Sequence, residues 1–244
     1  EDEVAAEEPL SLLINGVHIV TLLVTPSMLK ELAIGYVVSE GLVRSLEEVK
    51  EVRIRENEVH MRIERENLED ELKSLSTPRI RFSSCGQREG GFLRVLDEIK
   101  RRKVDSKVKF TVDHVLRAAW HLNSSSKLYR VCGGVHVVMA LDKEYEVKAM
   151  AEDVGRHNAV DKVVGSLLLK EEDPRKMLLA CSGRLTSEMV MKAVRVGFPV
   201  LASISAPTDL GIRLAEKSGL TLIGFVRGRR MNVYSHPERI VDRT

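Results

Sequence analysis

The second half of the chain alternates between strand-like and helix-like segments, and this alternation limits the possible folds more than any other feature. Short runs of aliphatic residues separate longer segments whose apolar positions have helical spacing. The predicted strands are residues 135–141, 146–150, 177–181, 200–204 and 220–226, and the predicted helices are residues 112–123, 158–169, 187–196 and 208–218. Such alternation is typical of an α/β domain in which helices cover a mixed or parallel sheet.

The first half has a different pattern, with two predicted hairpins on either side of a helix. Asn15-Gly16 lies between two strand-like runs and is a strong signal for a tight hairpin turn. Thr25 and Pro26 predict the start of a helix, and Gly41 predicts its C-terminal cap. The expected elements are hairpins within residues 10–24 and 50–65 and a short surface helix within residues 67–75. We therefore divide the chain into an α+β portion, residues 1–110, and an α/β domain, residues 111–244.

The composition excludes several classes of protein. Aromatic residues make up 4% of the chain and the formal net charge is +2, so neither stacking platforms nor a basic footprint for nucleic acid is expected. No apolar run approaches the length of a membrane span, and the acidic first residues do not resemble a signal peptide. We expect a cytoplasmic protein that binds neither nucleic acid nor membrane.

Cys85 is the most reactive thiol that the sequence predicts. It lies in a stretch rich in glycine and serine, residues 77–91, which predicts a mobile loop. Arg81 and Arg88 are close in sequence, and neighbouring cations favour the nucleophilic thiolate. From these residues alone, a functional thiol and an incidental loop cysteine are equally good interpretations.

The other two cysteines are expected to be structural. Cys132 and Cys181 lie beside or within apolar strand patterns, where thiols are usually buried. Three cysteines at long spacings do not form a disulfide framework, in agreement with a reducing compartment.

Glycine–arginine pairs occur at the ends of predicted strands and helices. Helix N-termini and backbone amides attract phosphate, and arginine binds phosphate in a bidentate manner. Together the pairs predict a site for a phosphate-bearing, nucleotide-like ligand, although each pair alone is more commonly a helix cap or turn with a solvated arginine. His157 adjoins the first pair and could bind phosphate or cap a loop. The pairs are Gly155-Arg156, Gly183-Arg184 and Gly228-Arg229, the last flanked by Arg227 and Arg230.

The sequence does not predict a metal site. A zinc deaminase needs His-x-Glu followed by Pro-Cys-x-x-Cys. His136 is followed by Val137 and Val138, and no two cysteines have the spacing of zinc ligands.

Blocks of sequence spread along the chain resemble the formate dehydrogenase accessory sulfurtransferases, the FdhD family. The block at residues 152–162, EDVGRHNAVDK, is long enough to be very specific. The others are residues 7–10, 31–35, 39–42, 83–86, 133–136, 182–184, 187–189, 205–208 and 224–234.

The resemblance implies a fold and an activity. The fold would be a cytidine-deaminase-like three-layer α/β/α domain with a smaller N-terminal and middle α+β portion, acting as a homodimer. Cys85 would receive sulfur from a cysteine desulfurase as a persulfide. The sulfur would then pass to a bis(molybdopterin guanine dinucleotide) cofactor, with molybdenum or tungsten, before that cofactor enters formate dehydrogenase.

The resemblance also implies where the cofactor binds. The family's cofactor-binding stretch matches residues 225–230, and this stretch joins the glycine–arginine pairs in one predicted site. The predicted cofactor-binding residues are Phe225, Val226, Arg227, Gly228, Arg229, Arg230, Gly183, Arg184, Gly155, Arg156 and His157.

The chain departs from the family at one position of the loop. The family usually has Cys-x-x-Cys, whereas here Arg88 takes the place of the second cysteine. A persulfide needs a single sulfur anchor, so sulfur transfer remains the leading interpretation. The alternatives are a non-catalytic chaperone that binds the pterin cofactor without sulfur transfer, and a nucleotide hydrolase or deaminase, which bound zinc would support.

Overall fold

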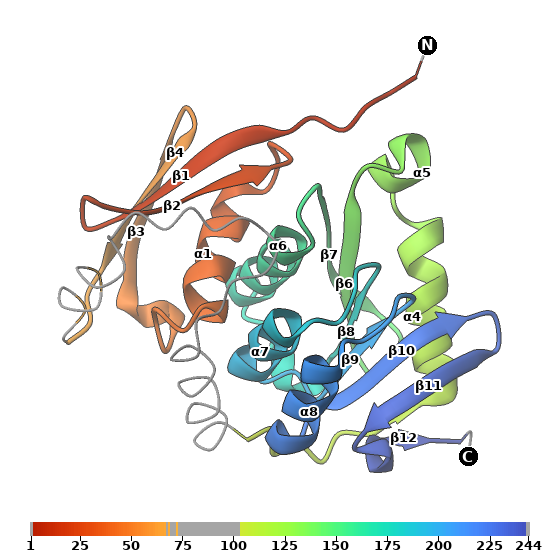
Figure 1. Cartoon of the computed structure of the whole chain (residues 1–244). Coiled ribbons are helices and arrows are strands. Elements are labelled where there is room, and N and C mark those ends of the chain that lie inside the picture. The colour runs from red at the N-terminus through yellow and green to blue at the C-terminus, as the bar shows by residue number, and fades with distance from the viewer. Residues whose placement is uncertain (1, 67, 69–71, 73–102, 243–244) are drawn as a thin grey trace.

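The computed structural model describes residues 2–66, 68, 72 and 103–242, and in them two large sheets of different character and one small two-stranded sheet (Figure 1). The N-terminal half contains β1 (Glu8–Ile14), β2 (Val17–Val24), α1 (Leu29–Ser39), β3 (Val49–Arg55) and β4 (Glu58–Ile63). The C-terminal half contains β5 (Phe110–Thr111), α4 (Val112–Ser124), α5 (Leu128–Cys132), β6 (His136–Leu141), β7 (Val147–Asp153), α6 (Arg156–Leu169), β8 (Leu178–Cys181), α7 (Ser187–Val196), β9 (Val200–Ser203), α8 (Asp209–Ser218), β10 (Thr221–Arg227), β11 (Arg230–Ser235) and β12 (Ile240–Val241). Single turns of 3₁₀-helix lie at Leu46–Glu48, Pro174–Lys176 and Pro237–Arg239.

The four-stranded N-terminal sheet has the order β2-β1-β4-β3. Both predicted hairpins are confirmed, and β1 joins them by pairing with β4 in parallel. Asn15 and Gly16 have φ angles of 50° and 81°, which suit the turn between twisted antiparallel strands. Alternate residues such as Leu10, Leu12 and Met61 are buried in one core with α1, so this sheet has one apolar face.

Helix α1 begins later than the sequence predicted. Met28, and not Thr25, precedes its first turn, so the predicted Thr25 cap is wrong. The Thr25 hydroxyl instead accepts a hydrogen bond from the Val154 amide at 3.2 Å, a partner that no local pattern could reveal. Gly41 follows the helix with a φ angle of 77°, as expected of a C-terminal glycine.

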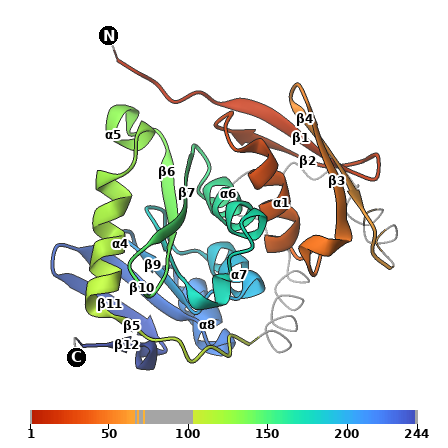
Figure 2. The same ribbon diagram turned by 180° about the vertical axis from the view of Figure 1, so that it is seen from behind.

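The six-stranded sheet has the order β11-β10-β9-β8-β6-β7 and is covered on both faces. Helix α4 lies on one face, and α6, α7 and α8 lie on the other (Figure 1 and Figure 2). Val137 and Met139 pack in the α4 core, whereas Val138 and Ala140 pack in the core under α6 to α8. The expected three-layer α/β/α domain with a smaller α+β portion is confirmed.

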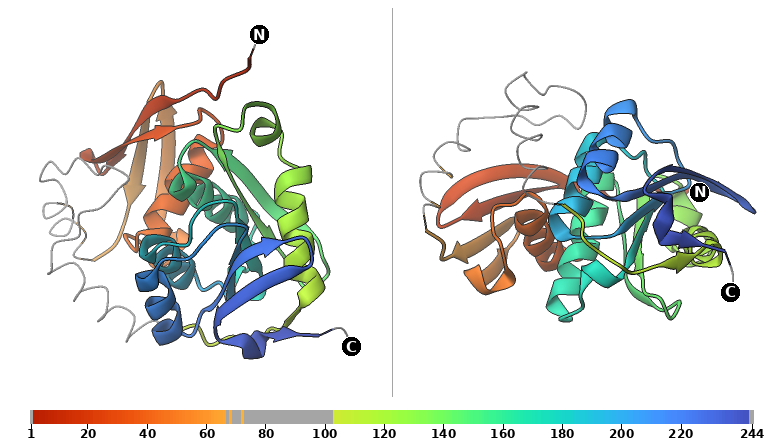
Figure 3. Two further views of the ribbon diagram at one scale, coloured as in Figure 1. Left: turned by 45° about the vertical axis from the view of Figure 1, so that its right-hand side comes forward. Right: turned by 90° about the horizontal axis from the view of Figure 1, so that it is seen from below.

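Helix α1 joins the two halves by packing on α6, with the four-stranded sheet on its outer side (Figure 3). The two backbones nearly touch: a Cβ added to Gly35 would lie 1.8 Å from the Asp161 carbonyl oxygen. A Cβ added to Gly165 would lie 1.9 Å from the Glu31 carbonyl oxygen. Glycine at both positions is what lets the helices approach so closely.

Residues just before α4 pack with the C-terminal half. Val104 lies in the core beneath α8, and its amide donates to the Ser218 carbonyl at 2.8 Å. Phe110 is fully buried, and β5 pairs with β12 near the C-terminus. Among the helices that the structure describes, none is long and apolar enough to cross a membrane.

Candidate functional site

One edge of the six-stranded sheet gathers the predicted ligand-binding loops. Strand pairing places His136 beside Asp153, and Cys181 beside Ser203. Because β6 runs antiparallel to β7 and β8, its first residue lies at the edge where those strands end. Helices α6, α7 and α8 begin at the same edge, which is where open α/β sheets bind ligands.

The first two glycine–arginine pairs touch one another. A Cβ added to Gly183 would lie 3.1 Å from Cβ of Arg156 and 3.5 Å from Nδ1 of His136. The neighbouring Ser182 hydroxyl accepts from the Val137 amide at 3.0 Å, which fixes the loop after β8 against the start of β6. The loops that follow β7 and β8 therefore form one continuous surface.

Helix α6 begins at Arg156, two residues earlier than predicted, with Gly155 at the capping position. Arg156 and His157 thus occupy the first turn, where the helix dipole favours anions. Nε2 of His157 lies 3.2 Å from a carboxylate oxygen of Glu188 in α7. The close approach of His157 lowers the pKa of Glu188, which favours the charged form of this carboxylate.

The edge is strongly cationic. Burial lowers the pKa of His136, and the charges of Arg156 and His157 lower it further. Burial and the nearby Arg184 also lower the pKa of Arg156. Within the described part of the chain, Nε of Arg156 and the hydroxyl of Thr186 are buried without a hydrogen-bond partner. Crowded cations with unused donors are suited to binding an anionic group.

The third pair reaches this edge through the loop after β9. The Phe225 amide donates to the Ser205 carbonyl at 3.0 Å, and Nε of Arg227 donates to the Ile204 carbonyl at 3.2 Å. Arg227, Gly228, Arg229 and Arg230 are exposed, whereas the side chain of Val226 is buried in the α4 core. Val226 therefore supports the hairpin from within and does not present its side chain to a ligand.

The cysteines differ in their surroundings. Burial raises the pKa of Cys181 to about 11, and its thiol lies 3.6 Å from the Gly183 carbonyl, so its predicted structural role is confirmed. Cys132 is only partly buried, contrary to expectation, because it ends a short surface helix, α5. Cys85, Arg88 and the predicted loop of residues 77–91 lie outside the described residues, as does most of the predicted helix at 67–75.

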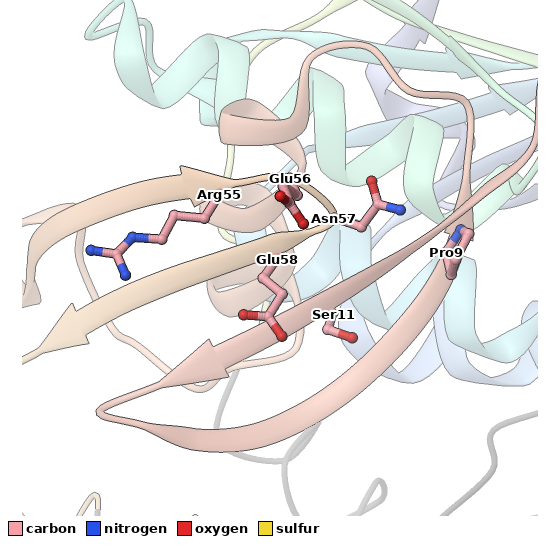
Figure 4. Close-up of a pocket in the computed structure, with 6 residues that line it drawn as sticks. All are labelled: Pro9, Ser11, Arg55, Glu56, Asn57 and Glu58. Carbon is pink, nitrogen blue, oxygen red and sulfur yellow. The ribbon is translucent and has the colours of Figure 1, made fainter.

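A hollow with a volume of about 540 Å³ lies on the N-terminal sheet, apart from this edge (Figure 4). It is an open surface groove beside the turn between β3 and β4, and its charges have both signs. Its lining residues are Pro9, Ser11, Arg55, Glu56, Asn57 and Glu58. Among the residues that the structure describes, no group of three or more histidine, cysteine or acidic side chains could hold a metal ion.

Sequence reasoning missed several residues of the sheet edge. His136, Thr186 and Glu188 were not in the predicted set, although each lies at a strand start or in a helix N-terminal turn. The position of His136 depends on the pairing of β6 with β8, which joins residues far apart in sequence. Local signals existed for three of the missed residues, because Ser182 directly precedes Gly183, and His136 and Glu188 lie in the family-like blocks 133–136 and 187–189.

Comparison with known proteins shows what this arrangement is related to. A sequence model of the FdhD/NarQ family matches residues 5–241. A relative from Shouchella clausii, named Sulfur carrier protein FdhD, is 38% identical over 242 residues, covering 98% of this chain and 90% of the relative. A relative of the same name from Sulfolobus acidocaldarius is 37% identical and covers 98% of this chain and 92% of its own length.

A solved structure has the same fold. The crystal structure is of a protein from Desulfotalea psychrophila that is assigned as a formate dehydrogenase accessory protein, and it matches with a TM-score of 0.79 at 28% identity. The match covers 98% of this chain and 91% of the other. Fold and side-chain arrangement define an α/β/α protein with basic residues gathered at one sheet edge. Within that class, the chain belongs to the FdhD/NarQ family, which confirms the resemblance seen in the sequence blocks.

Proposed function

We propose that this chain is a sulfur carrier for the maturation of formate dehydrogenase. The observation that carries the proposal is its 36–38% identity, over nearly its whole length, to relatives named Sulfur carrier protein FdhD. The solved relative, assigned as a formate dehydrogenase accessory protein, supports the same client. The chain would work in the cytoplasm as a homodimer, as the family resemblance implies.

Cys85 is the proposed sulfur anchor. Cys181 is buried and its pKa is about 11, so it supplies little thiolate near neutral pH. Cys85 has basic neighbours in sequence and matches the first loop cysteine of the family. Its thiolate would attack the outer sulfur of a persulfide on a cysteine desulfurase. The S–S bond of the donor breaks, the donor cysteine leaves as a thiolate, and Cys85 holds the transferred sulfur without any net oxidation.

The acceptor would be the bis(molybdopterin guanine dinucleotide) cofactor, with molybdenum or tungsten, held as a substrate at the sheet edge. Its pyrophosphates carry charges that Arg156, Arg184, Arg227 and Arg229 could meet. The unused donors of Arg156 and Thr186 and the first turns of α6 and α7 support this assignment. His136, with its lowered pKa, would add a neutral partner among the arginines.

Mass spectrometry can test the sulfur step directly. The protein is incubated with a cysteine desulfurase and cysteine, and each cysteine-containing peptide is examined for the added mass of one sulfur atom. We expect the added sulfur on Cys85 in the parent and in Cys132→Ala, and its loss in Cys85→Ala. Sulfur that stays in Cys85→Ala and disappears in Cys132→Ala would overturn the assignment. Binding of GDP with no persulfide on any cysteine would instead favour a cofactor chaperone without sulfur transfer.

A further inference from the structure

The turn between β7 and α6, which presents Arg156 and His157 at the sheet edge, is fixed by a buried carboxylate. Asp153 has no exposed surface. Its Oδ1 accepts from the Gly155 amide at 2.8 Å and from Nδ2 of Asn158 at 2.9 Å. Its Oδ2 lies 2.6 Å from Nζ of Lys162. One side chain therefore holds both the start of the turn and the first two turns of the helix.

The same carboxylate also ties the turn to the N-terminal half. Oδ2 of Asp153 accepts from the Thr25 amide at 3.1 Å, and the Thr25 hydroxyl accepts from the Val154 amide at 3.2 Å. The Thr25 carbonyl accepts from Nζ of Lys162 at 2.9 Å. We call Asp153, Lys162, Asn158 and Thr25 the Asp153 cluster. The segment that follows β2 is thus bonded to both sides of the turn.

The cluster leaves the turn little freedom to move. A Cβ added to Gly155 would lie 2.6 Å from Nδ2 of Asn158, so the turn is packed against the residue that binds it. Burial lowers the pKa of Lys162 while Asp153 opposes this shift, so the ammonium depends on the carboxylate for its charge. Arg156 in turn packs on Gly183, and a shift of the turn would carry the guanidinium away from the loop after β8.

We propose that Asp153 and Thr25 are positioning residues for anion binding, which they support through Arg156 and His157 without touching the ligand. The inference rests on the proposed function, because it assumes that the sheet edge binds the nucleotide end of the cofactor. Asp153 is fully buried, so its effect on a ligand must pass through the turn. Arginine hydrogen bonds need close alignment, and a small displacement of their support weakens them.

Calorimetric titration of GDP into matched variants tests the proposal. Arg156→Ala should weaken binding about tenfold, since it removes a charge-assisted contact. Thr25→Val, which removes the acceptor for the Val154 amide, should weaken it about threefold, as expected for one lost neutral hydrogen bond. Thr25→Ser keeps the hydroxyl and should bind like the parent. In an Arg156→Ala/His157→Ala background, Thr25→Val should cause little further loss, because the two side chains that the turn positions are gone.

Asp153→Asn removes half of a buried ion pair and risks unfolding the protein. Asp153→Asn/Lys162→Met removes both charges and serves as the second variant, again with weaker GDP binding than the parent. If Thr25→Val weakens GDP binding equally in the parent and in Arg156→Ala/His157→Ala, the positioning role is overturned. It is also overturned if Thr25→Val and Asp153→Asn/Lys162→Met both bind GDP like the parent. If Arg156→Ala binds GDP like the parent, the proposed nucleotide site falls together with this inference. If Arg156→Ala binds GDP weakly while the Thr25 and Asp153 variants bind it like the parent, the nucleotide site stands and only the positioning role is wrong.

Discussion

Two buried carboxylates join the halves of the molecule, and they do so in different ways. Asp153 accepts from two backbone amides, that of Gly155 in the turn that leads to the site and that of Thr25 in the N-terminal half, as well as from side chains. Asp161 lies in α6, and among the described residues its carboxylate accepts from side chains of α1 and α7. Nζ of Lys192 lies 2.8 and 2.9 Å from its two oxygens, and the Ser39 hydroxyl lies 2.5 Å away. Nζ of Lys192 is also 2.9 Å from Glu40, and we call Asp161, Lys192, Ser39 and Glu40 the Asp161 cluster.

The comparison separates two uses of a buried ion pair. The bonds of the Asp161 cluster fasten α1, α6 and α7 to each other and do not hold the turn that carries Arg156, so the cluster should support stability alone. The Asp153 cluster fastens the turn that carries Arg156, so it should support both stability and binding. Equal burial therefore does not imply equal function, and variants of the two clusters should differ in GDP binding as well as in stability.

The largest effect is expected from Lys192→Met. Burial alone would lower the pKa of Lys192, but Asp161 and Glu40 raise it above its usual value, so the lysine is charged. Its loss leaves the Asp161 carboxylate buried without a countercharge, which should cost about 3–5 kcal/mol of unfolding free energy. Urea unfolding followed by circular dichroism measures this loss. GDP affinity of the folded variant should equal that of the parent, and weaker binding would show that the two clusters are not separable.

Gly35→Ala should destabilise the protein by about 3 kcal/mol, because a methyl group cannot fit against the Asp161 carbonyl without moving α1 off α6. That movement would also lengthen the contacts of the Asp161 cluster. Gly134→Ala is the matched control, since its nearest contact would be an ordinary 3.4 Å, and it should change stability by less than about 0.5 kcal/mol. Equal unfolding midpoints for the two variants would contradict the close helix contact.

Ser39→Ala should cost about 2 kcal/mol, because it removes a buried donor to a charged carboxylate while leaving Lys192 in place. The matched control is Ser11→Ala, which loses an exposed hydroxyl contact to Thr21 and should be nearly neutral. Both are measured by urea unfolding. A Ser39→Ala variant as stable as Ser11→Ala would mean that Lys192 alone satisfies Asp161.

The smallest effect is expected from Glu188→Gln at the pair with His157. A carboxylate whose folded pKa is lowered adds stability at neutral pH and loses it as the pH falls through that folded pKa. Because the Glu188 side chain is 55% exposed, the contribution should stay below about 1 kcal/mol. Urea unfolding should show that the free energy of unfolding differs slightly between parent and variant at neutral pH and does not differ at about pH 3. A difference that persists in acid would point to a role other than charge.

Much of the fold could be predicted because its elements follow local rules. The buried strands are continuous apolar runs, and the helices have apolar stripes, so their limits agreed within a few residues. The strand β11 was missed because three of its first residues, Arg230, Met231 and Asn232, are exposed or partly exposed at a sheet edge. The parallel pairing of β1 with β4 also could not be predicted from local patterns, because it joins strands from two separate hairpins.

The site was predicted in part for the same reason. Glycine–arginine pairs at strand ends are a local pattern, and the sheet brought the pairs at Arg156 and Arg184 together. The contacts that fix them are not local: Thr25 acts on Asp153 and Val154, and His136 arrives through strand pairing. Such partners depend on which halves of the chain dock together, and the sequence alone does not specify that.

The bond between Thr25 and Asp153 spans 128 positions of the chain, and this separation has a consequence during synthesis on the ribosome. At about 5–20 residues per second, roughly 6 to 26 s pass between the emergence of the two partners. During that interval α6 has not yet been synthesised, so the side of α1 that later packs on it lacks this partner. A ribosome-bound chaperone that shields this helix should therefore increase the yield of folded protein, and a pause in translation before residue 153 should lower it.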